Sequence, residues 1–295
     1  MNYVITGSIG HISKPIVEQL VAKKHNVRVI TSSESRKSEI EALGATALIG
    51  SVSDASFINN AFTNADAVYL MIPPKWAVTN WFEYQQQVAE NYIAAIIKNN
   101  IKKVVLLSSI GAHMPNGAGP IDGLGYLEEK LVALTNVDTL ALRPSYFFYN
   151  LLSMIPLIKQ ANIIGSNFGG TEKLVLVDTD DIAAVAIDAL LKLNFNGFNT
   201  QYIASDERET SEIASILGTA IDKPNLSWVV FNDEQNLQGL LGAGLSNTIA
   251  EGYTQMGKSI REGHIQADYW KNRPSLGKLK LEEFAERFAL AYKNS

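Results

Sequence analysis

NYVITGSIGHISKPIVEQL, residues 2–20, is the stretch that decides the fold of this chain. Its beginning, Tyr3–Ile5, is a short apolar run suited to a strand buried on both faces. A Gly-x-x-Gly turn follows from Gly7 to Gly10, and apolar residues then recur at helical spacing from Ile16 to Leu20. We therefore predict a strand, a glycine turn and a helix in direct succession.

A turn of this kind is a cradle for phosphate groups. Gly7 lets the chain turn sharply, and Gly10 removes the Cβ that would hold a diphosphate away from the backbone. The free N–H groups at the helix start then face the anion, with the positive end of the helix dipole behind them. Ser13 occupies the place of a third glycine and is small enough for close helix–strand packing. The alternative is an ordinary glycine-bearing turn, but the strand–helix units that follow favour the phosphate-binding interpretation.

The alternation of strand and helix continues to about residue 145. Further strands are predicted at 27–31, 45–49, 66–72, 103–107 and 139–142, with helices at 35–43, 55–62, 80–98 and 125–134. Asp54 is well placed as the N-cap of the helix at 55–62. Six strands that alternate with helices predict a parallel sheet covered on both faces, which is the doubly wound α/β class.

Beyond residue 145 the pattern changes, and we predict a smaller, mixed, mostly helical region at 146–295. Short strands are expected at 174–177, 202–204 and 227–231, and helices at 146–161, 210–221, 234–242, 246–262 and 281–292, with one more capped by Asp180. Its strands and helices would partly return to the first sheet. The region would lie over the carboxyl ends of the strands, where ligands bind in such sheets.

Composition excludes several functional classes. The chain has 295 residues, of which 46% are hydrophobic and 19% charged, and its formal net charge is −5. No basic stripe is available for direct nucleic-acid binding. The absence of cysteine excludes disulfides and thiolate chemistry, and the histidines are too scattered to predict a metal site. With neither a signal peptide nor a long apolar run, we expect a soluble, cytoplasmic protein without membrane contact.

The residues after the second predicted strand bear on the type of nucleotide. Ser32 and Ser33 are followed by Arg36, and hydroxyls beside a guanidinium form a suitable site for a dianionic phosphate. Glu34 is contrary, because a carboxylate at such a position can accept a hydrogen bond from the ribose 2′-hydroxyl of NAD. We therefore favour NADP(H) over NAD(H) as the cofactor.

Four motifs together resemble the NmrA-like family of atypical short-chain dehydrogenases/reductases. They are Thr6–Gly10, Pro73-Pro74, Ser108–Ala112 (SSIGA) and Leu142–Leu151 (LRPSYFFYNL). The resemblance covers residues 1–150 and implies an NAD(P)-binding Rossmann domain at 1–145, with 146–295 as the substrate-binding region. The family includes NAD(P)H-dependent reductases as well as proteins that bind the dinucleotide and only report redox state.

The resemblance also implies a cofactor site, residue by residue. The turn residues would surround the diphosphate: Gly7, Ser8, Ile9, Gly10, His11 and Ile12. Ser32, Ser33 and Arg36 would face the adenosine ribose. Residues after the later strands would line the nicotinamide end: Met71, Ile72, Pro73, Ser108, Ser109, Ser145, Tyr146 and Phe147. On the substrate side we expect Tyr146 and Asn150, and also Trp81, whose ring would either wall a pocket or pack the long helix.

Tyr126 and Lys130 spell the Tyr-x-x-x-Lys pair of the wider superfamily. One helical turn places both side chains on one face, where the lysine lowers the phenol pKa and the tyrosine protonates a carbonyl oxygen. Ser109 would hold that oxygen. In the alternative alignment the superfamily tyrosine falls near Ile121, its lysine falls near Gly125 and Glu129 is the helix carboxylate. Tyr126 at the helix start would then border the nicotinamide, and Lys130 would be an exposed lysine paired with neighbouring glutamates.

These observations leave two functions of different classes. The first is an NAD(P)H-dependent oxidoreductase that reduces a small, fairly apolar carbonyl, quinone or similar acceptor. The second is a dinucleotide-sensing regulator without turnover that acts through a protein partner. A sugar-nucleotide epimerase shares the fold, but the apolar segment 146–158 argues against a second nucleotide pocket.

Overall fold

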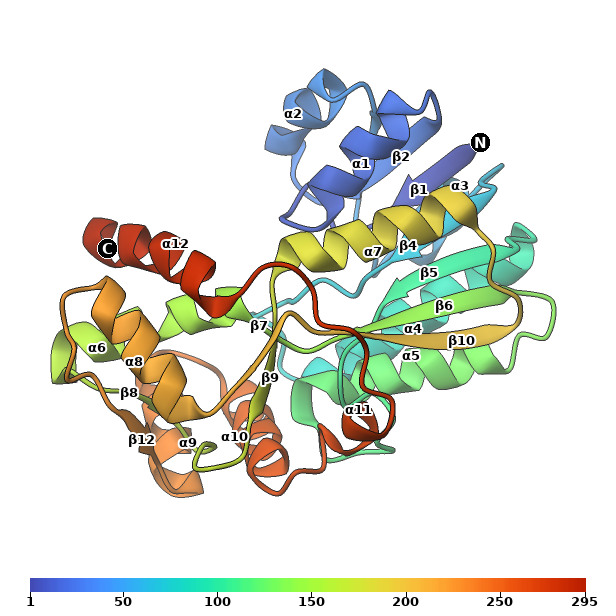
Figure 1. The fold of residues 1–295 in the computed structure, drawn as a ribbon. Coiled ribbons are helices and arrows are strands. Elements are labelled where there is room, and N and C mark those ends of the chain that lie inside the picture. The colour runs from blue at the N-terminus through green and yellow to red at the C-terminus, as the bar shows by residue number, and fades with distance from the viewer.

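The computed structural model describes residues 1–295 and contains a seven-stranded, fully parallel sheet (Figure 1). Its strand order is β3–β2–β1–β4–β5–β6–β10. The strands are β1 (Asn2–Ile5), β2 (Asn26–Thr31), β3 (Thr46–Ile49), β4 (Ala67–Leu70), β5 (Lys103–Leu107), β6 (Asp138–Pro144) and β10 (Phe198–Ile203). The six predicted strands are confirmed. The seventh comes from the C-terminal half and pairs with β6 in parallel, from Phe198 beside Thr139 to Ile203 beside Pro144.

Helices cover both faces of this sheet, as the doubly wound prediction requires. On one face lie α1 (Ser13–Ala22), α2 (Lys37–Ala42) and α7 (Thr179–Lys192), and on the other lie α3 (Ala55–Ala61), α4 (Trp81–Lys98) and α5 (Asp122–Val132). Between them, Tyr3, Val4 and Ile5 of β1 are completely buried. Burial of a side chain of this size contributes about 1.5–3 kcal/mol, which explains why a strand of four residues can form the centre of the sheet.

Some element boundaries differ from the sequence prediction. The helix expected from Gly125 begins three residues earlier, at Asp122, whose carboxylate accepts hydrogen bonds from the N–H groups of Gly117 and Ala118. The N-cap of α7 is Asp178 rather than Asp180, because the Asp178 side chain accepts from the Asp180 N–H. The predicted cap at Asp54 is confirmed.

The segment predicted as one helix from 146 to 161 is divided into three parts. Tyr146–Phe147 forms strand β7, which pairs with β9 (Leu174–Val177), and Phe148–Met154 is a 3₁₀-helix that precedes α6 (Ile155–Ala161). Pairing with β9 withdraws the first two residues from the helix, an effect of tertiary structure that local spacing does not reveal.

The remaining C-terminal elements pack around a separate hydrophobic core. Strand β11 (Asp206–Arg208) joins β9 and β7 in a small mixed sheet, and β8 (Ile164–Ser166) pairs with β12 (Trp228–Val230). The helices are α8 (Thr210–Ala220), α9 (Asp233–Gly242), α10 (Asn247–Arg261), α11 (Ala267–Lys271) and α12 (Leu281–Asn294). Their apolar side chains and those of the β5–α5 connection form one buried cluster. This region lies beside the carboxyl ends of the main strands (Figure 1).

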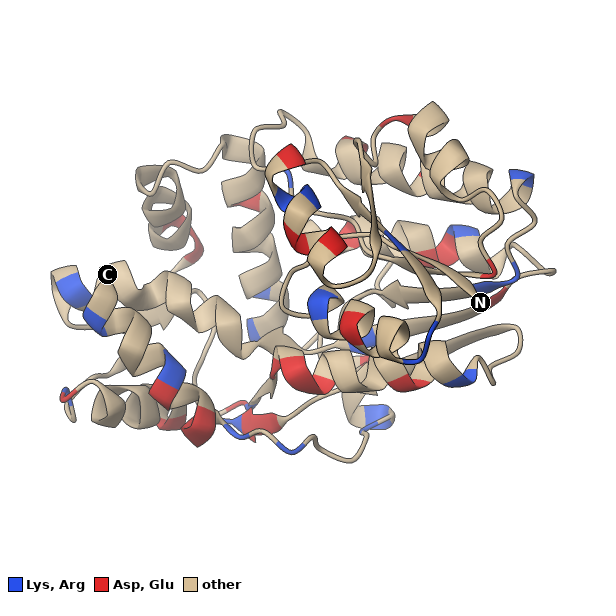
Figure 2. Ribbon diagram, turned by 90° about the horizontal axis from the view of Figure 1, so that it is seen from above, with Lys and Arg blue, Asp and Glu red and all other residues tan.

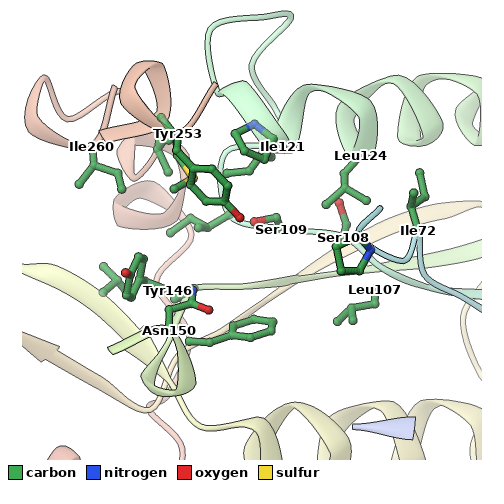
Figure 3. Close-up of a pocket in the computed structure, with 18 of the residues that line it drawn as sticks. Ile72, Leu107, Ser108, Ser109, Ile121, Leu124, Tyr146, Asn150, Tyr253 and Ile260 are labelled. Carbon is green, nitrogen blue, oxygen red and sulfur yellow. The ribbon is translucent and has the colours of Figure 1, made fainter. Parts of the chain in front are cut away.

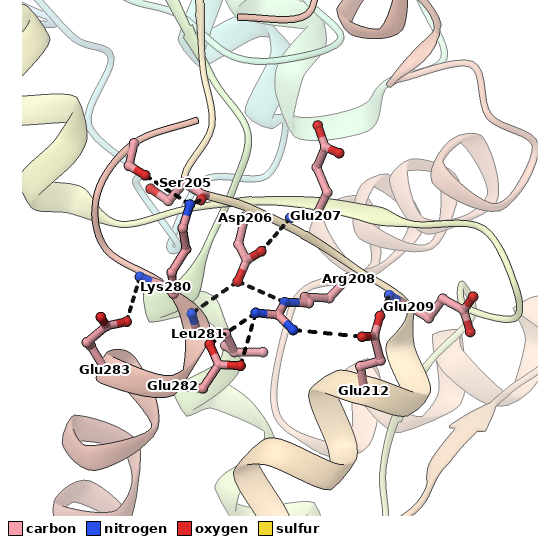
Figure 4. Close-up of polar contacts among 11 residues, drawn as sticks. Ser205, Asp206, Glu207, Arg208, Glu209, Glu212, Lys280, Leu281, Glu282 and Glu283 are labelled. Carbon is pink, nitrogen blue, oxygen red and sulfur yellow. Dashed lines mark hydrogen bonds and ion pairs between the residues drawn. The ribbon is translucent and has the colours of Figure 1, made fainter. Parts of the chain in front are cut away.

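An ion-pair network attaches α12 to β11 (Figure 4). Arg208 donates through Nε to Asp206 at 2.9 Å and through Nη2 to Glu282 at 3.0 Å. Asp206 also accepts from the Leu281 N–H at the start of α12, at 3.2 Å. Lys280 reaches the carbonyl oxygen of Ser205 at 2.5 Å. The network therefore holds the first turn of α12 against the strand before α8.

Charged residues of both signs are interspersed over the molecule, as Figure 2 shows from above. No helix of the structure combines the length and the apolarity needed to cross a bilayer.

We predict that Arg208→Met lowers the free energy of unfolding by about 1–3 kcal/mol, because it leaves the buried Asp206 carboxylate without its cation. The side chain of Asp206 is only 9% exposed. Urea denaturation measures the loss. The matched control is Lys192→Met, which breaks an exposed ion pair with Asp188 and should cost less than about 0.5 kcal/mol. Equal losses in the two variants would contradict the bracing role of Arg208.

Candidate functional site

The turn between β1 and α1 has the strained geometry that its glycines permit. Gly7 has φ +86°, and a Cβ there would lie 2.7 Å from Cγ and Sδ of Met71. Ser8 follows with φ +59°, which is uncommon for a residue with a side chain. At Gly10, by contrast, a Cβ would meet only the Gly7 carbonyl oxygen, at 4.0 Å. Gly7 is therefore required by the fold, whereas Gly10 borders open space.

The helix that follows this turn has no N-terminal cap from the protein. α3 and α4 are capped by Asp54 and Asn80, but no side chain caps α1. The N–H groups of Gly10, His11 and Ile12 have no acceptor within the chain. Free donors at the positive end of a helix dipole can bind an anion. The turn thus meets the requirement for a diphosphate site.

Residues expected around a ribose lie next to this turn. The Ser8 hydroxyl donates to Oγ1 of Thr31, at the end of β2, at 3.1 Å. Ser32, Ser33 and Arg36 follow and are exposed. Arg36 is paired with Glu39 at 3.0 Å, and both side chains of that pair are about half exposed.

A cavity of about 290 Å³ lies at the carboxyl ends of β4, β5 and β6 (Figure 3). It brings together most of the residues predicted for the nicotinamide end and all three predicted for the substrate: Met71, Ile72, Ser108, Ser109, Ser145, Tyr146, Phe147, Trp81 and Asn150. Pro73 does not line it, but Pro74 does. The glycine turn and the residues predicted to face the ribose lie outside this cavity. The ring of His11 contacts that of Tyr149, one residue from Asn150, in a tilted arrangement with centroids 4.5 Å apart and an interplanar angle of 47°.

The cavity lining carries no charge, because none of its 23 residues is acidic, basic or histidine. Its polar side chains fall into two groups. Ser108, Ser145, Gln85 and Gln266 are engaged within the protein, for example Gln266 with the Val175 N–H at 2.8 Å. The side chains of Ser109, Tyr146, Asn150 and Tyr253 have no such partner, and the indole nitrogen of Trp81 is buried without one.

The two tyrosines are the titratable residues of the cavity. Burial raises the pKa of both phenols, and more strongly for Tyr146, where the neighbouring Tyr253 adds to the effect. Both hydroxyls therefore stay protonated, and able to donate a hydrogen bond, throughout the physiological pH range.

The predicted Tyr126–Lys130 pair does not line this cavity. The ammonium of Lys130 lies 4.8 Å from the centre of the Tyr126 ring, so the two side chains share one face of the helix, as their spacing predicts. However, the Tyr126 hydroxyl donates to Glu90 of α4, and Lys130 pairs with the same carboxylate at 3.6 Å. The hydrogen bond to Glu90 also raises the pKa of Tyr126. Ile121, the residue before α5, and Leu124 of α5 line the cavity instead.

The buried carboxylate of α5 is Glu128, not Glu129, which is exposed. Glu128 accepts from Nη2 of Arg143 at 2.6 Å and from Nε at 3.1 Å, and it accepts from the Ser108 hydroxyl at 2.5 Å. Arg143 also donates to the Tyr202 hydroxyl at 3.0 Å. Burial alone would lower the pKa of Arg143, but the pairing with Glu128 outweighs it and raises this pKa. The network fixes Ser108 and leaves Ser109 facing the cavity.

Sequence reasoning did not identify the cavity residues of α10. Tyr253, Met256 and Ile260 of this helix line the cavity. With the buried Ile249 they form a stripe at helical spacing, which is a detectable signal. The stripe predicts a buried helix face, but it does not show that the face covers a ligand site.

Several known proteins are similar to this chain in sequence or in fold. The profile of a protein family described as NAD(P)H-binding matches residues 7–192. An NAD(P)H azoreductase of Xenophilus azovorans is 22% identical over 253 residues, which cover 86% of this chain and 85% of that protein.

Two solved structures share the fold over almost the whole chain. An NADPH-dependent quinone oxidoreductase of Escherichia coli, in complex with NADPH, has a TM-score of 0.80 at 17% sequence identity. The match covers 97% of this chain and 99% of that protein's chain. A triphenylmethane reductase of Citrobacter has a TM-score of 0.78 at 17% sequence identity. The match covers 97% of this chain and 100% of that protein's chain.

We predict that Glu128→Gln lowers the free energy of unfolding by about 3 kcal/mol, because it removes the carboxylate that neutralises the buried Arg143. The side chains of Arg143 and Glu128 are 9% and 6% exposed. Thermal or urea unfolding measures the change. Glu129→Gln is the matched control on the exposed face and should unfold as the wild type does. If the two variants were equally stable, the buried pair would not be needed for folding.

Proposed function

The chain belongs to the family of NAD(P)H-binding proteins, since the family profile matches 7–192, and from this premise we propose that it is an NAD(P)H-dependent oxidoreductase. Its substrate is a small, fairly apolar carbonyl, quinone or similar acceptor. The observation that carries this proposal is an uncharged cavity, with several unpartnered hydrogen-bonding groups, at the sheet edge beside the uncapped turn. Within the family, we propose that it belongs to the NmrA-like branch, because its motifs resemble those of that branch.

The cofactor diphosphate binds at the N–H groups of Gly10–Ile12. These donors are free, and the space beside Gly10 is open, so the residues present fit the group. Met71, Ile72 and Ser109 line the cavity and would border the nicotinamide end of the cofactor. When bound, the nicotinamide supplies a hydride. The protein excludes water with apolar side chains and orients the acceptor with hydrogen-bond donors.

NADP(H) is preferred to NAD(H) in this proposal. Ser32, Ser33 and Arg36 are exposed beside the turn, and Arg36 is held only by the exposed Glu39. A 2′-phosphate can compete for this guanidinium, because a charged pair so exposed contributes little to stability.

The acceptor binds under the C-terminal region, for which we propose the boundaries 146–295. Helix α7 and strand β10 of this region return to the main sheet, while α10 and the segment after β6 enclose the cavity. The uncharged lining favours neutral, apolar acceptors. It offers no cation for the diphosphate of a sugar nucleotide.

Turnover tests the proposal. We expect the purified protein to oxidise NADPH with one or more members of a panel of aldehydes, ketones and quinones, followed by NADPH absorbance. If NADPH bound tightly but no acceptor were reduced, the oxidoreductase proposal would be wrong. The dinucleotide-sensing alternative would then predict a protein partner whose binding depends on the redox state of the cofactor.

Gly10→Leu should weaken NADPH binding by at least about 100-fold, because the side chain fills the space where the diphosphate would bind, and the free donors lose their anion. Fluorescence titration measures the affinity. Stability should be unchanged, since no atom lies closer than 4.0 Å to a Cβ at this position. Gly239→Leu is the matched control, because a Cβ there also meets open space, on α9. Undiminished affinity in Gly10→Leu would exclude this turn as the diphosphate site.

Arg36→Ala should weaken NADPH binding by about 10-fold to 100-fold and leave NADH binding nearly unchanged, since a charged hydrogen bond contributes about 1.5–3 kcal/mol. Parallel titrations with the two cofactors measure the difference. Glu39→Gln should have the opposite effect, because it frees Arg36 from its ion pair. A uniform change for both cofactors would mean that Arg36 does not contact the 2′-phosphate.

A further inference from the structure

The proposed reduction needs a proton as well as a hydride, and the predicted donor is in the wrong place. Tyr126 is bound to Glu90 outside the cavity. Ser108 lines the cavity, but its hydroxyl proton is directed at Glu128. The acid must therefore come from the lining residues whose polar groups are free: Ser109, Tyr146, Asn150, Tyr253 and Trp81.

Tyr253 extends from α10 into the cavity, and its hydroxyl end points toward Ser109 at the end of β5 (Figure 3). No atom of the chain accepts a hydrogen bond from this hydroxyl, and none donates to it. Ser109 adjoins Ser108, which is fixed by the buried ion pair. The phenol therefore faces a fixed position at the sheet edge, and a ligand placed between them would receive its hydrogen bond.

The ring of Tyr253 is held by two tryptophans, one in the β4–α4 connection and one at the start of α4. Trp76 stacks on it, with centroids 6.3 Å apart and an interplanar angle of 15°, and Trp81 meets it edge-on at 6.0 Å. Thr248, near the start of α10, donates to the Thr79 carbonyl oxygen at 2.8 Å. Two elements distant in sequence thus fix the direction of one phenol, as proton transfer requires.

We propose that Tyr253 is the catalytic acid of this enzyme and delivers the proton to the heteroatom of the bound acceptor, an inference that rests on the proposed oxidoreductase function. The hydride adds to one end of the acceptor's π system. The electron pair of the broken π bond moves to the heteroatom at the other end, which forms a bond to the Tyr253 proton. The phenolate left behind regains a proton from water. Ser109 donates a hydrogen bond to the same heteroatom and positions it.

Tyr253 is better suited to this role than the other free groups. Asn150 and Trp81 do not ionise, and a serine hydroxyl is a far weaker acid than a phenol. Tyr146 packs edge-on against Phe168 at 5.9 Å, and burial raises its pKa more than that of Tyr253, so its phenolate is harder to form. Tyr146 is the titratable group that interacts with Tyr253, since no carboxylate or cation lines the cavity.

Tyr253→Phe tests the assignment because it removes the hydroxyl and keeps the ring between the tryptophans. Three further variants, Tyr146→Phe, Tyr126→Phe and the remote Tyr292→Phe on α12, are matched comparisons. Each is measured for NADPH affinity, for kcat as a function of pH, and for binding of menadione to the NADP⁺-loaded protein. Menadione is a small apolar quinone that cannot react in that state, and quenching of tryptophan fluorescence follows its binding.

In Tyr253→Phe we expect kcat to fall by about 10²-fold to 10⁴-fold, with NADPH affinity unchanged. Menadione should bind about five-fold more weakly, the value of one neutral hydrogen bond. The wild-type kcat should be independent of pH near neutrality, because the phenol is protonated below its raised pKa. In Tyr253→Phe, kcat should decrease as pH rises, because the proton must then come from solvent.

Tyr126→Phe and Tyr292→Phe should behave as the wild type, and Tyr146→Phe should alter menadione binding without the sloping pH profile. The inference is overturned if Tyr253→Phe retains kcat and a flat profile, or if Tyr126→Phe or Tyr146→Phe acquires the slope instead. These outcomes all require an active wild type. A wild-type protein that reduces no acceptor would instead refute the proposed function, and the catalytic assignment with it.

Discussion

The hydroxyl of Thr6 connects the two strands between which the strand order of the sheet reverses. It donates to the Tyr69 carbonyl oxygen at 3.1 Å and accepts from the Met71 N–H at 2.7 Å, which joins the end of β1 to the end of β4. The two chains then separate, one into the glycine turn and the other into the β4–α4 connection. Because Met71 is held against the turn, only a glycine fits at position 7. The crevice for a ligand opens at this place and cannot shift along the sheet.

The N–H groups at the start of α1, on one side of this crevice, have no acceptor in the protein, whereas the Ser108 hydroxyl on the other side is hydrogen-bonded to Glu128. The first turn of α1 lacks the side-chain cap that α3, α4 and α7 possess, so an anion can complete it. At the end of β5, by contrast, the buried pair of Glu128 and Arg143 engages Ser108. A desolvated pair of this kind does little for net stability, but it is costly to break. Here it determines which of two adjacent serines faces the cavity.

The C-terminal half completes the site that the N-terminal sheet begins. Strand β10 extends the main sheet and α7 covers one of its faces, so the two halves share a core. From this shared base, α10 reaches over the strand ends and supplies three of the cavity residues. The lining is uncharged, so a ligand in this cavity would be selected by shape and by a few hydrogen bonds.

Strand positions, the glycine turn and the class of fold follow from local patterns in the chain. Buried parallel strands are apolar runs, and the turn requires glycine at fixed spacing, so the elements up to β6 are predictable within a few residues. Spacing also placed Tyr126 and Lys130 correctly on one helix face. It could not show that this face packs toward Glu90 of α4.

Tertiary packing alone decided which side chains meet at the cavity. One residue along a helix turns the side chain by about 100°, which is why Glu128 is buried in an ion pair while Glu129 lies in solvent. Tyr253 comes to lie opposite Ser109 because α10 folds back over the sheet and two tryptophans hold its ring. Contacts between residues so distant in sequence depend on how the layers pack, and no local periodicity records that packing.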